Sequence, residues 1–387
     1  MKPIRRPSRE ALAWLGAESA LQRRRCRALA ADAAALARRR ARWAEEFLAR
    51  LATRGFDEAA GVRRPVRPEE LPAARGRRLR ATTAPTGRPH IERGLDRAVP
   101  WRALRLPGFP RGLGTKVLSV DPGTGAASLR LRYARGAGLP GGYSDSDVEL
   151  FVVRGAVDLG ATRHGAGSYL YVPRGVALPA LACPRGAELL AFYVDGPPSF
   201  TPSDSDHPRA ERERLVVVDA VADLDWDAAS TYPAALPGRL VKVLHVEPRS
   251  RALTCLVALA PQFRRDAVGY ADCATEEVVL AGELWTLQSG PRPAGSYAWR
   301  PAYANQGPVA SERGALVLVR SAAELVVATH FNPWSTPAEN RAQAASRLRH
   351  ARPELYAAIA AGRRTAPADF EFPVDAAPRR GRRRARP

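Results

Sequence analysis

Cysteine is scarce in this sequence, and the few cysteines that occur are scattered. The 387 residues contain four, Cys26, Cys183, Cys255 and Cys273, with no CxxC pair. That spacing supports neither a disulfide framework nor a structural zinc site, because both need cysteines that lie in pairs or clusters. We therefore expect free thiols in a reducing compartment, and the cytoplasm as the location.

Long apolar runs and familiar catalytic motifs are also missing. No apolar run approaches the roughly 18 residues of a transmembrane helix. The start of the chain, MKPIRRPSREALAWLG, has no apolar core or small-residue cleavage site, so we expect no signal peptide. No nucleotide-binding loop, Gly-x-Ser-x-Gly, HExxH or Cys/His pair at catalytic spacing occurs. The sequence leaves open whether the protein is an enzyme.

Lysine is nearly absent, with three in the whole chain, so almost every positive charge behind the net +21 is arginine. Residues 1–100 carry 24 basic and 11 acidic side chains, and 331–387 carry 12 and 5, whereas 101–330 carry 24 and 23. The basicity therefore lies in the flanks. Abundant Arg, Ala, Gly and Pro together indicate a GC-rich coding sequence, which weakens any argument for nucleic-acid binding from charge alone.

One segment of the sequence occurs twice. Residues 142–155 read GYSDSDVELFVVRG and residues 269–282 read GYADCATEEVVLAG. Both copies have Gly-Tyr, an acid two residues after the Tyr, another acid four residues later, and an apolar run that reaches a Gly. The match extends over 115–192 and 241–320, and the offset changes only from 126 at the Lys to 127 at the Tyr and 128 at the Pro. This pattern predicts a tandem duplication of one all-β unit.

Short apolar runs between Gly, Pro and Asp turns predict antiparallel strands in both copies. In the first copy the runs are TKVLSV, ASLRLRY, VELFVV, SYLYVP and AELLAFYV. In the second copy we expect strands near 215–218, 240–247, 253–260, 276–281, 284–288, 296–300 and 315–320.

The flanks of the duplicated region have a different composition. A helix with a heptad-like apolar stripe is expected within 8–54, and its Arg-rich face is interpreted as solvated, with a nucleic-acid or membrane surface as the alternative. Thr336, Pro337 and Glu339 form a capping box for a helix, and Pro353 begins another, PELYAAIAA. The expected organisation is an N-terminal helical segment at 1–60, an extended Arg/Pro-rich connector at 61–100, β units at 101–200 and 213–330 joined by a linker at 201–212, C-terminal helices at 331–365, and a disordered basic tail at 366–387.

At these repeated segments the sequence resembles the cupin superfamily. The strand that reaches a Gly, the Gly-Ser-Tyr opening and the Pro turn occur in both copies. GSYAWRP at 295–301 resembles bicupins related to anti-sigma-factor cupins and to acetylacetone-cleaving cupin dioxygenases, and HFNPWSTPAEN resembles the segment that follows the second barrel in uncharacterised bicupins. Over roughly 110–345 the resemblance implies a mainly β fold of two tandem jelly-roll barrels, also called double-stranded β-helices.

The resemblance also implies where a metal would bind. A cupin barrel holds a divalent cation with a His-x-His pair, a Glu and a third His. Carried over position by position, the His-x-His pairs become Tyr143 with Asp145 and Tyr270 with Asp272, the Glu positions hold Glu149 and Glu276, and the third His positions hold Leu178 and Gln306. No His remains at any of these positions. Without imidazole, the chemistry of iron, copper, nickel or zinc has no support.

Two interpretations of these positions remain open. In the first, no cofactor is bound, and the carboxylates pair with Arg or with backbone N–H groups. In the second, the second barrel keeps an oxygen-rich site of Asp272, Glu276 and Gln306 that would suit magnesium, calcium or manganese. His245, on the repeated KVLHVEP strand, is interpreted as a structural His with satisfied hydrogen bonds.

The leading prediction is a cytoplasmic bicupin with eroded metal sites that binds a small molecule or serves as a scaffold. Its pocket lies in the second barrel and is defined by Tyr270, Asp272, Glu276, Trp299, Arg300 and Gln306, with Tyr143, Asp145 and Glu149 at the related positions of the first. One alternative is an enzyme, metal-dependent or metal-free, acting on a small carbonyl or amide compound. Another has Arg-rich flanks that bind nucleic acid or an acidic partner while the barrels form a homodimer. No membrane partner is expected.

Overall fold

The computed structural model describes residues 87–226, 238–265, 269–286, 288–304 and 306–329, together with residue 13 and, near the C-terminus, 342, 345–346, 348–350 and 353–361. The helix expected within 8–54, residues 61–86 of the connector, most of the helix after Thr336 and the basic tail lie outside these residues. None of the described helices is long and apolar enough to cross a membrane.

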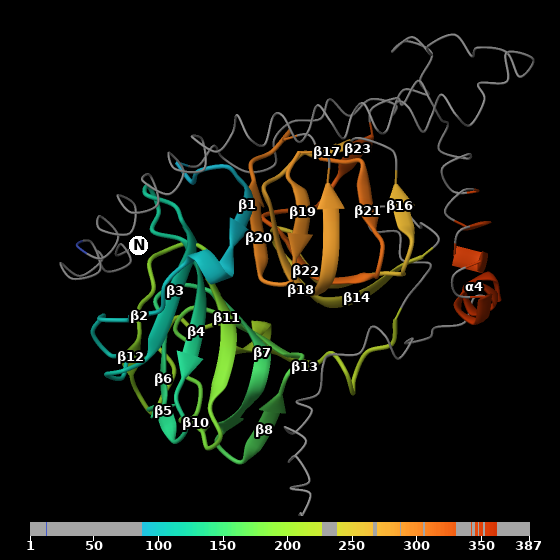
Figure 1. The fold of residues 1–387 in the computed structure, drawn as a ribbon. Coiled ribbons are helices and arrows are strands. Elements are labelled where there is room, and N and C mark those ends of the chain that lie inside the picture. Colours follow the sequence, from blue (N-terminus) through green and yellow to red (C-terminus); the bar gives the residue numbers. More distant parts are fainter. Residues whose placement is uncertain are drawn as a thin grey trace, which may run out of the picture.

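Two large antiparallel sheets lie side by side (Figure 1). The first has ten strands: β2 (Arg102–Ala103), β3 (Gly114–Val120), β4 (Ala127–Tyr133), β5 (Ala137–Leu139), β7 (Val148–Leu159), β8 (Thr162–Gly165), β9 (Ser168–Val172), β10 (Leu181–Cys183), β11 (Ala187–Tyr193) and β13 (Val216–Asp219). The second has nine: β1 (Ile91–Leu95), β14 (Arg239–Val246), β15 (Leu253–Leu259), β16 (Phe263–Arg265), β18 (Thr275–Thr286), β19 (Gly290–Pro293), β20 (Ser296–Arg300), β21 (Val309–Ser311) and β22 (Ala315–Ser321). The mainly β prediction is confirmed.

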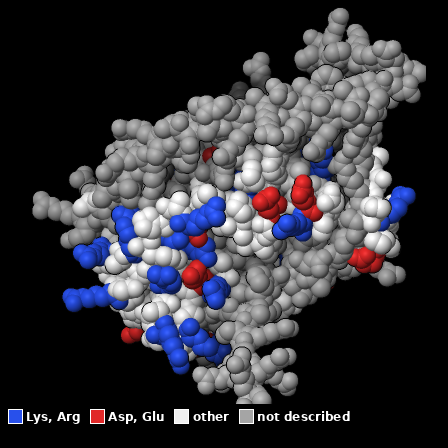
Figure 2. Space-filling view, viewed as in Figure 1, with Lys and Arg blue, Asp and Glu red and all other residues white. Residues whose placement is uncertain are grey.

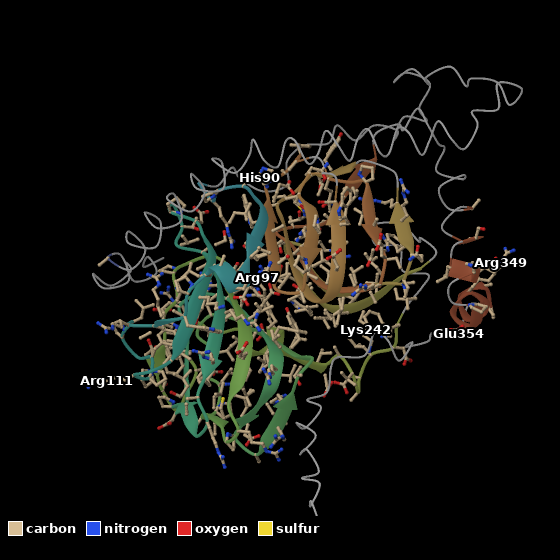
Figure 3. The ribbon with its side chains drawn as sticks, in the orientation of Figure 1. His90, Arg97, Arg111, Lys242, Arg349 and Glu354 are labelled. Carbon is tan, nitrogen blue, oxygen red and sulfur yellow. The ribbon has the colours of Figure 1, made fainter. Side chains whose placement is uncertain are left out.

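Smaller elements complete the described chain. Two strand pairs flank the large sheets, β6 (Gly142–Tyr143) with β12 (Thr201–Pro202) and β17 (Gly269–Ala271) with β23 (Val327–Thr329). The 3-10 turns η3 and η4 span Asp96–Ala98 and Arg212–Arg214, and the helix α4 spans Pro353–Ala360. Figure 3 shows α4, marked by Glu354, beside the second sheet, and the buried Leu348 that precedes it packs into the core that the two sheets share.

Each sheet contains one edge strand from the chain segment that immediately precedes the other sheet in sequence. Strand β1 precedes the first sheet in sequence but pairs with β20 of the second, and Ile91 lies opposite Trp299. Strand β13 precedes the second sheet but pairs with β9 of the first, and Val216 lies opposite Tyr171. The prediction of a surface connector through residue 100 is therefore wrong for β1, because this segment closes a sheet edge and buries Ile91. This exchange ties the two sheets together.

The predicted strands are largely confirmed, with two corrections. The strand expected at 215–218 in the second copy is β13, which belongs to the first sheet. Two separate strands were expected at 276–281 and 284–288, but β18 runs unbroken from Thr275 to Thr286. Gly155 in β7 and Gly282 in β18 have positive φ angles, 74° and 70°. At these residues each long strand changes partners: beyond Gly155 it pairs with β8, and beyond Gly282 with β19. Gly suits this bend because other residues rarely adopt positive φ.

The alternation of side chains along the strands produces several apolar cores, of which the three described below are the largest. One fills the interior of the first sheet, with Val148, Val152 and Leu170 among its members. A second, smaller core lies inside the second sheet and includes Val279 and Val317. The third core lies between the sheets, because residues of both sheets pack together in it. Its members from the first sheet include Phe151, Tyr169, Tyr171, Leu190 and Phe192, and those from the second include Leu240, Leu256, Val278, Tyr297, Trp299, Leu316 and Leu318. Both faces of the central strands are therefore buried (Figure 3).

Candidate functional site

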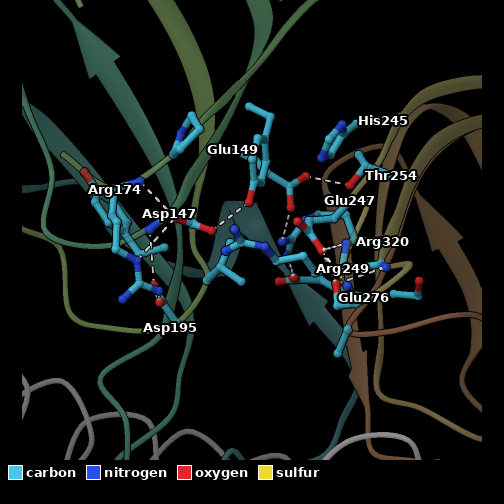
Figure 4. A pocket seen from close by; sticks show the side chains of 18 of the residues that line it. Asp147, Glu149, Arg174, Asp195, His245, Glu247, Arg249, Thr254, Glu276 and Arg320 are labelled. Carbon is cyan, nitrogen blue, oxygen red and sulfur yellow. Dashed lines mark hydrogen bonds and ion pairs between the residues drawn. The ribbon is translucent and has the colours of Figure 1, made fainter. Parts of the chain in front are cut away.

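A cavity of about 500 Å³ lies between the two sheets. Strands of both sheets supply its walls, as Figure 4 shows with the green ribbon of the first sheet on one side and the brown ribbon of the second on the other. The charged or ring side chains that line it are Arg88, Asp147, Glu149, Tyr171, Arg174, Tyr193, Asp195, Arg209, Glu211, Arg214, His245, Glu247, Arg249, Glu276, Trp299 and Arg320. A cavity of this size can hold a metabolite-sized molecule.

The wall of the cavity contains two buried carboxylates held by one guanidinium. Glu149 on β7 is 6% exposed and Glu276 on β18 is 4% exposed. Arg320 on β22 donates to both, from Nη2 to Glu149 Oε1 at 2.5 Å and from Nη1 to Glu276 Oε2 at 2.5 Å. The pair of bonds joins the first sheet to the second through a charged triad, in a region where unpaired charges would be costly.

The remaining bonds to the two carboxylates follow a matching pattern. Each Glu accepts from a Tyr of its own sheet: Tyr169 Oη donates to Glu149 at 2.9 Å and Tyr297 Oη donates to Glu276 at 2.6 Å. Each also accepts from a hydroxyl of the other sheet, Glu149 from Thr254 at 2.5 Å and Glu276 from Ser128. The two carboxylates therefore have equivalent surroundings, related by an approximate two-fold relationship between the sheets.

Two further arginines are related by the same approximate two-fold relationship between the sheets. Arg88 and Arg214 are 126 residues apart, the offset of the repeated strands. Arg88 lies over the Trp299 ring at 5.5 Å and donates to Glu276 at 3.2 Å. Arg214 lies over the Tyr171 ring, also at 5.5 Å. Each arginine therefore combines a cation–π contact with hydrogen bonds at the cavity.

Arg214 connects several acidic groups at the cavity wall. Its Nη2 atom donates to Asp147 at 3.1 Å, to Glu247 at 3.0 Å and to the Tyr171 hydroxyl at 2.5 Å. The Tyr171 hydroxyl in turn donates to Asp147 at 2.6 Å. Burial and the hydrogen bond to Asp147 raise the pKa of Tyr171 well above its ordinary range, so the phenol stays protonated.

The carboxylates of the triad remain ionised despite their burial. Burial alone would raise the pKa of Glu149, but the charge and hydrogen bond of Arg320 outweigh it and hold the pKa below its ordinary value of 4.5. Burial alone would also raise the pKa of Glu276, but the charges of Arg88 and Arg320 outweigh burial and lower this pKa. Neither carboxylate is therefore a good general base near neutral pH.

His245 on β14 is the exception to this pairing. Its ring stacks on Tyr171, with centroids 4.3 Å apart and planes at 25°. The residue is 8% exposed, yet its buried Nε2 atom has no hydrogen-bond partner among the described residues. Burial lowers the pKa of His245 below 6.5, and this effect exceeds the opposing charges of Glu149 and Glu247. The interpretation of His245 as a satisfied structural residue is thus wrong: its neutral imidazole lines the cavity and has a buried Nε2 without a hydrogen-bond partner among the described residues.

The structure divides the residues that the sequence assigned to one second-barrel pocket. Glu276 and Trp299 line the cavity between the sheets, together with Glu149 from the first sheet. Arg300 and Gln306 belong to the interior of the second sheet, where Gln306 lines a smaller cavity and Arg300 pairs with Glu277. The grouping failed because β18 is buried on both faces, and alternation sends Glu276 and Glu277 to opposite sides.

Four further predicted residues lie apart from both cavities' lining. Tyr270 packs near Tyr303, with ring centroids 5.7 Å apart, and the buried Asp272 accepts a hydrogen bond from Val326 N at 3.1 Å. In the first sheet's region, the ring of Tyr143 lies 5.9 Å from that of His207, and Asp145 is exposed. These contacts hold surface turns in place and bring none of the four side chains to a shared site.

The interior of the second sheet does not suit the divalent metal that a cupin barrel implies. The carboxylate that points into it is Glu277, whose partners are Arg292 and Arg300. Glu276 faces the other side and is bonded to arginines, so the oxygen-rich trio of Asp272, Glu276 and Gln306 does not form. Among the described residues no three His, Cys, Asp or Glu side chains are grouped as metal ligands. Guanidinium groups around a single carboxylate repel a cation, so these residues do not fit the metal.

Several residues that line the cavity were not predicted from the sequence as site residues, namely Arg88, Asp147, Arg214, Thr254 and Arg320. The repeat contained a usable signal, because Arg88 with Arg214 and Ser128 with Thr254 have the 126-residue offset of the aligned strands. Arg320 had no such signal, since the residue 128 positions earlier is Phe192. Only the approach of the two sheets shows that one arginine serves both.

The comparisons with known proteins agree with the fold. A sequence family described as "Domain of unknown function (DUF4437)" matches residues 97–328. No curated protein matches the sequence.

Among solved structures, a "putative dioxygenase" from Nostoc punctiforme PCC 73102 is similar, with a TM-score of 0.59 and 20% identity over 65% of this chain and 94% of that chain. Oxalate decarboxylase from Bacillus subtilis at pH 4.6 has a TM-score of 0.44 and 13% identity, over 64% of this chain and 80% of that one. The likeness to the first of these structures, at 20% identity, concerns the fold alone and supports the mainly β fold that the sequence predicts.

Proposed function

This chain belongs to the DUF4437 family, and we propose that it binds a small polar organic molecule in the cavity between its two sheets. The observation that carries the proposal is His245, a buried imidazole whose Nε2 has no partner among the described residues and which lines a cavity of about 500 Å³. A buried polar atom without a hydrogen bond is costly, and a ligand that bonded to it would remove that cost.

The lining indicates the kind of molecule. The rings of Trp299 and Tyr171 line the cavity, and the neutral imidazole of His245 donates or accepts one hydrogen bond according to its tautomer. The carboxylates of the wall are already bound to arginines, so a ligand needs no large charge to satisfy them. A compact, weakly charged molecule with a planar part and a hydrogen-bonding group fits this arrangement best.

The evolutionary part of the proposal is that the two sheets are cupin units from one duplication, with metal positions that have been lost. The nearly constant offset of the repeated strands, 126 to 128 residues, supports the duplication. The matching surroundings of Glu149 and Glu276 support it independently, because equivalent bonds to equivalent residues are expected from related units. The replaced positions, with Leu178 in one copy and Gln306 in the other, support the loss of the metal.

The enzymatic alternative depends on the same histidine. A neutral His245 near the ring hydroxyl of Tyr171 could act as a general base on a small carbonyl or amide compound. The lowered pKa values of Glu149 and Glu276 argue against either carboxylate as the general base. A catalytic role would require turnover that is lost when His245 is replaced.

Binding by the Arg-rich flanks stays a prediction. The helix within 8–54 and the tail after 366 lie outside the described residues. In the face shown by Figure 2, Lys and Arg side chains gather over the first sheet with Asp and Glu among them. The charges of 101–330 nearly cancel, which gives the described core little attraction for nucleic acid.

The test is a thermal-shift screen of the purified full chain against small amides, hydroxy acids, amino acids and sugars. A compound that binds only the folded protein raises its melting temperature, and at 100 times Kd the gain is about 2.7 kcal/mol. Replacing His245 with Phe keeps a ring against Tyr171 but removes both ring nitrogens. We expect this variant to lose the shift, while His164→Phe, on β8 and outside the cavity lining, keeps it. Hits that bind H245F as tightly as the unaltered protein would refute the proposal.

A further inference from the structure

The interior of the second sheet contains a group of buried arginines around one carboxylate. Glu277 on β18 accepts a hydrogen bond from Arg292 Nη1 at 2.6 Å, and Arg300 Nη1 lies 3.0 Å from the same oxygen. Arg300 also contacts Glu92 of β1 through Nε at 3.2 Å. A third arginine, Arg265, lines the adjoining cavity together with Glu277.

These arginines have more hydrogen-bond donors than the described residues can accept. Arg292 and Arg300 are 0% and 2% exposed. The buried atoms Arg292 Nε and Nη2, Arg300 Nη2 and Arg265 Nε have no hydrogen-bond partner among the described residues. Guanidinium N–H groups donate and never accept, so only an acceptor can satisfy them. Such buried donors are rarely left unmet in a folded protein.

In this interior, positively charged side chains outnumber negatively charged ones. The guanidinium groups of Arg265, Arg292 and Arg300 lie near two carboxylates, those of Glu277 and Glu92, and a fourth guanidinium, that of Arg239, lines the same cavity. Burial lowers the pKa of Arg292 and of Arg265 and exceeds the opposing effect of Glu277, whereas for Arg300 the charges of Glu277 and Glu92 outweigh burial and raise the pKa. Burial acts upward on Glu277, but Arg300 and Arg292 outweigh it and bring its pKa to about 2. The region therefore attracts a further negative charge.

Space for such a charge lies beside Arg265 and beside Glu277, the carboxylate that Arg292 and Arg300 contact. A cavity of about 110 Å³ is lined by Arg239, Arg265, Glu277, Thr286 and Gln306 on its polar side, with apolar side chains such as Val317 opposite. A single water occupies about 30 Å³ in the liquid, so several waters or one small ion can be accommodated. Thr286 and Gln306 add hydrogen-bond donors.

The first sheet lacks this arrangement. At the positions 127 or 128 residues earlier, Glu277 corresponds to Leu150, Arg300 to Val172 and Gln306 to Leu178. Val172 belongs to the apolar core of the first sheet, and Leu150 and Leu178 pack against it. The charged interior is thus specific to the second sheet, where the cupin fold would lead one to expect a metal cation.

We propose that the interior of the second sheet binds a small oxyanion, a carboxylate or phosphate, at Arg265, Arg292 and Arg300 in place of a metal. Guanidinium groups suit this ligand because two parallel N–H donors match two oxygens of a carboxylate or phosphate. The site is separate from the cavity between the sheets, because Glu277 and Glu276 point to opposite faces of β18.

The experiment is calorimetric titration of the full chain, freed of small anions, with acetate and, separately, with inorganic phosphate. We expect saturable binding of at least one of the two. Arg265→Gln should weaken it at least tenfold, whereas Arg313→Gln, at an exposed turn residue, should leave it unchanged. The two titrations distinguish a carboxylate from a phosphate site. Absence of binding by both anions, or equal binding by R265Q and R313Q, would overturn the proposal.

A second variant separates anion binding from a merely structural ion pair. Glu277→Gln keeps the size of the side chain but removes the competing negative charge. If the arginines form an anion site, this variant should bind the anion at least tenfold more tightly, and the anion should restore its melting temperature. If they serve only to pair with Glu277, E277Q would be less stable and no anion would restore it, which would contradict the proposal. Loss of the His245 ligand in H245F should leave this site unaffected.

Discussion

Arg320, at the end of the second sheet's β22, donates a 2.5 Å hydrogen bond to Glu149 on β7 of the first sheet. Its other terminal nitrogen serves Glu276, so one guanidinium balances carboxylates from both sheets. The contact lies at the wall of the cavity that we propose as the binding site. The stability of the sheet-to-sheet interface and the shape of the cavity therefore depend on the same residue.

Replacing Arg320 with Met should destabilise the protein strongly. The change leaves Glu149 buried without its cation, and breaking a buried pair in this way costs about 3 to 5 kcal/mol. The lower end is expected, because Arg88 still contacts Glu276. Denaturant unfolding measures the effect. Arg163→Met provides the control, since Arg163 lies 3.8 Å from Asp158 and is half exposed, and should cost less than about 1 kcal/mol.

The cost of R320M should shrink as the pH falls. In the unaltered protein Glu149 and Glu276 have lowered pKa values, so their contribution is complete above the ordinary value of 4.5 and is lost as the pH falls below it. In R320M burial dominates and raises the pKa of Glu149, so the protonated native form gains stability on acidification. Unfolding free energies at pH 7, 5 and 4 check this. A cost that is constant across these pH values would show that the carboxylates are not the cause.

His245 should make stability depend on pH in a different range. Burial lowers the pKa of His245, so below its ordinary value of 6.5 the unfolded chain binds a proton that the native protein excludes. Stability should fall as the pH decreases from 6.5. His245→Phe cannot titrate, and its stability should change less over the same range. Parallel curves for the two proteins between pH 7 and 5 would contradict the neutral, buried imidazole.

The exchanged edge strands give a matched pair of substitutions. Ile91 on β1 is 7% exposed and packs into the core between the sheets, whereas Val217, 126 residues later on β13, is 47% exposed. Ile91→Ala should cost about 2 to 4 kcal/mol, because it leaves a cavity in a packed core. Val217→Ala should cost less than about 1 kcal/mol. Similar losses for both, measured by thermal or chemical unfolding, would show that β1 does not close the second sheet.

The two bends of the long strands should tolerate no side chain. A Cβ atom at Gly282 would meet the carbonyl oxygen of Gly314, and the positive φ adds strain. Gly282→Ala should therefore cost at least about 2 kcal/mol. Gly155→Ala should behave alike, because its Cβ would meet the carbonyl oxygen of Gly186. Gly165→Ala serves as the control, since a Cβ there has nothing within 4 Å.

Much of the strand content could be predicted, and the reasons are local. The run ASLRLRY became β4 with the bounds Ala127–Tyr133, because its Leu and Tyr residues alternate with Arg between Gly-containing turns, which is the period of a strand. The alternation within 276–281 also predicted a strand. It could not show that the strand continues past Gly282, because the new partner, β19, is supplied by the return of the chain.

The candidate site was predicted only in part, and Glu276 shows why. The sequence marked it as a chemically important carboxylate, and it is buried, ionised and bound at a cavity. Its assignment to the interior of a barrel was wrong, because a strand buried on both faces has no polar side to indicate which residues point inward. The neighbouring residue, Glu277, is the one whose side chain points into the interior of the second sheet.

By itself the sequence determined most of the strands and the repeated segment with its nearly constant offset, because these depend on residue order and on the two-residue period of a strand. The tertiary structure alone decided that Glu149 and Glu276 face each other across the two sheets, that Arg320 joins them, and that the buried Nε2 of His245 has no hydrogen-bond partner among the described residues. Those relationships depend on which sheet faces meet in space, and a shift of one residue in that choice exchanges every inward side chain for its outward neighbour.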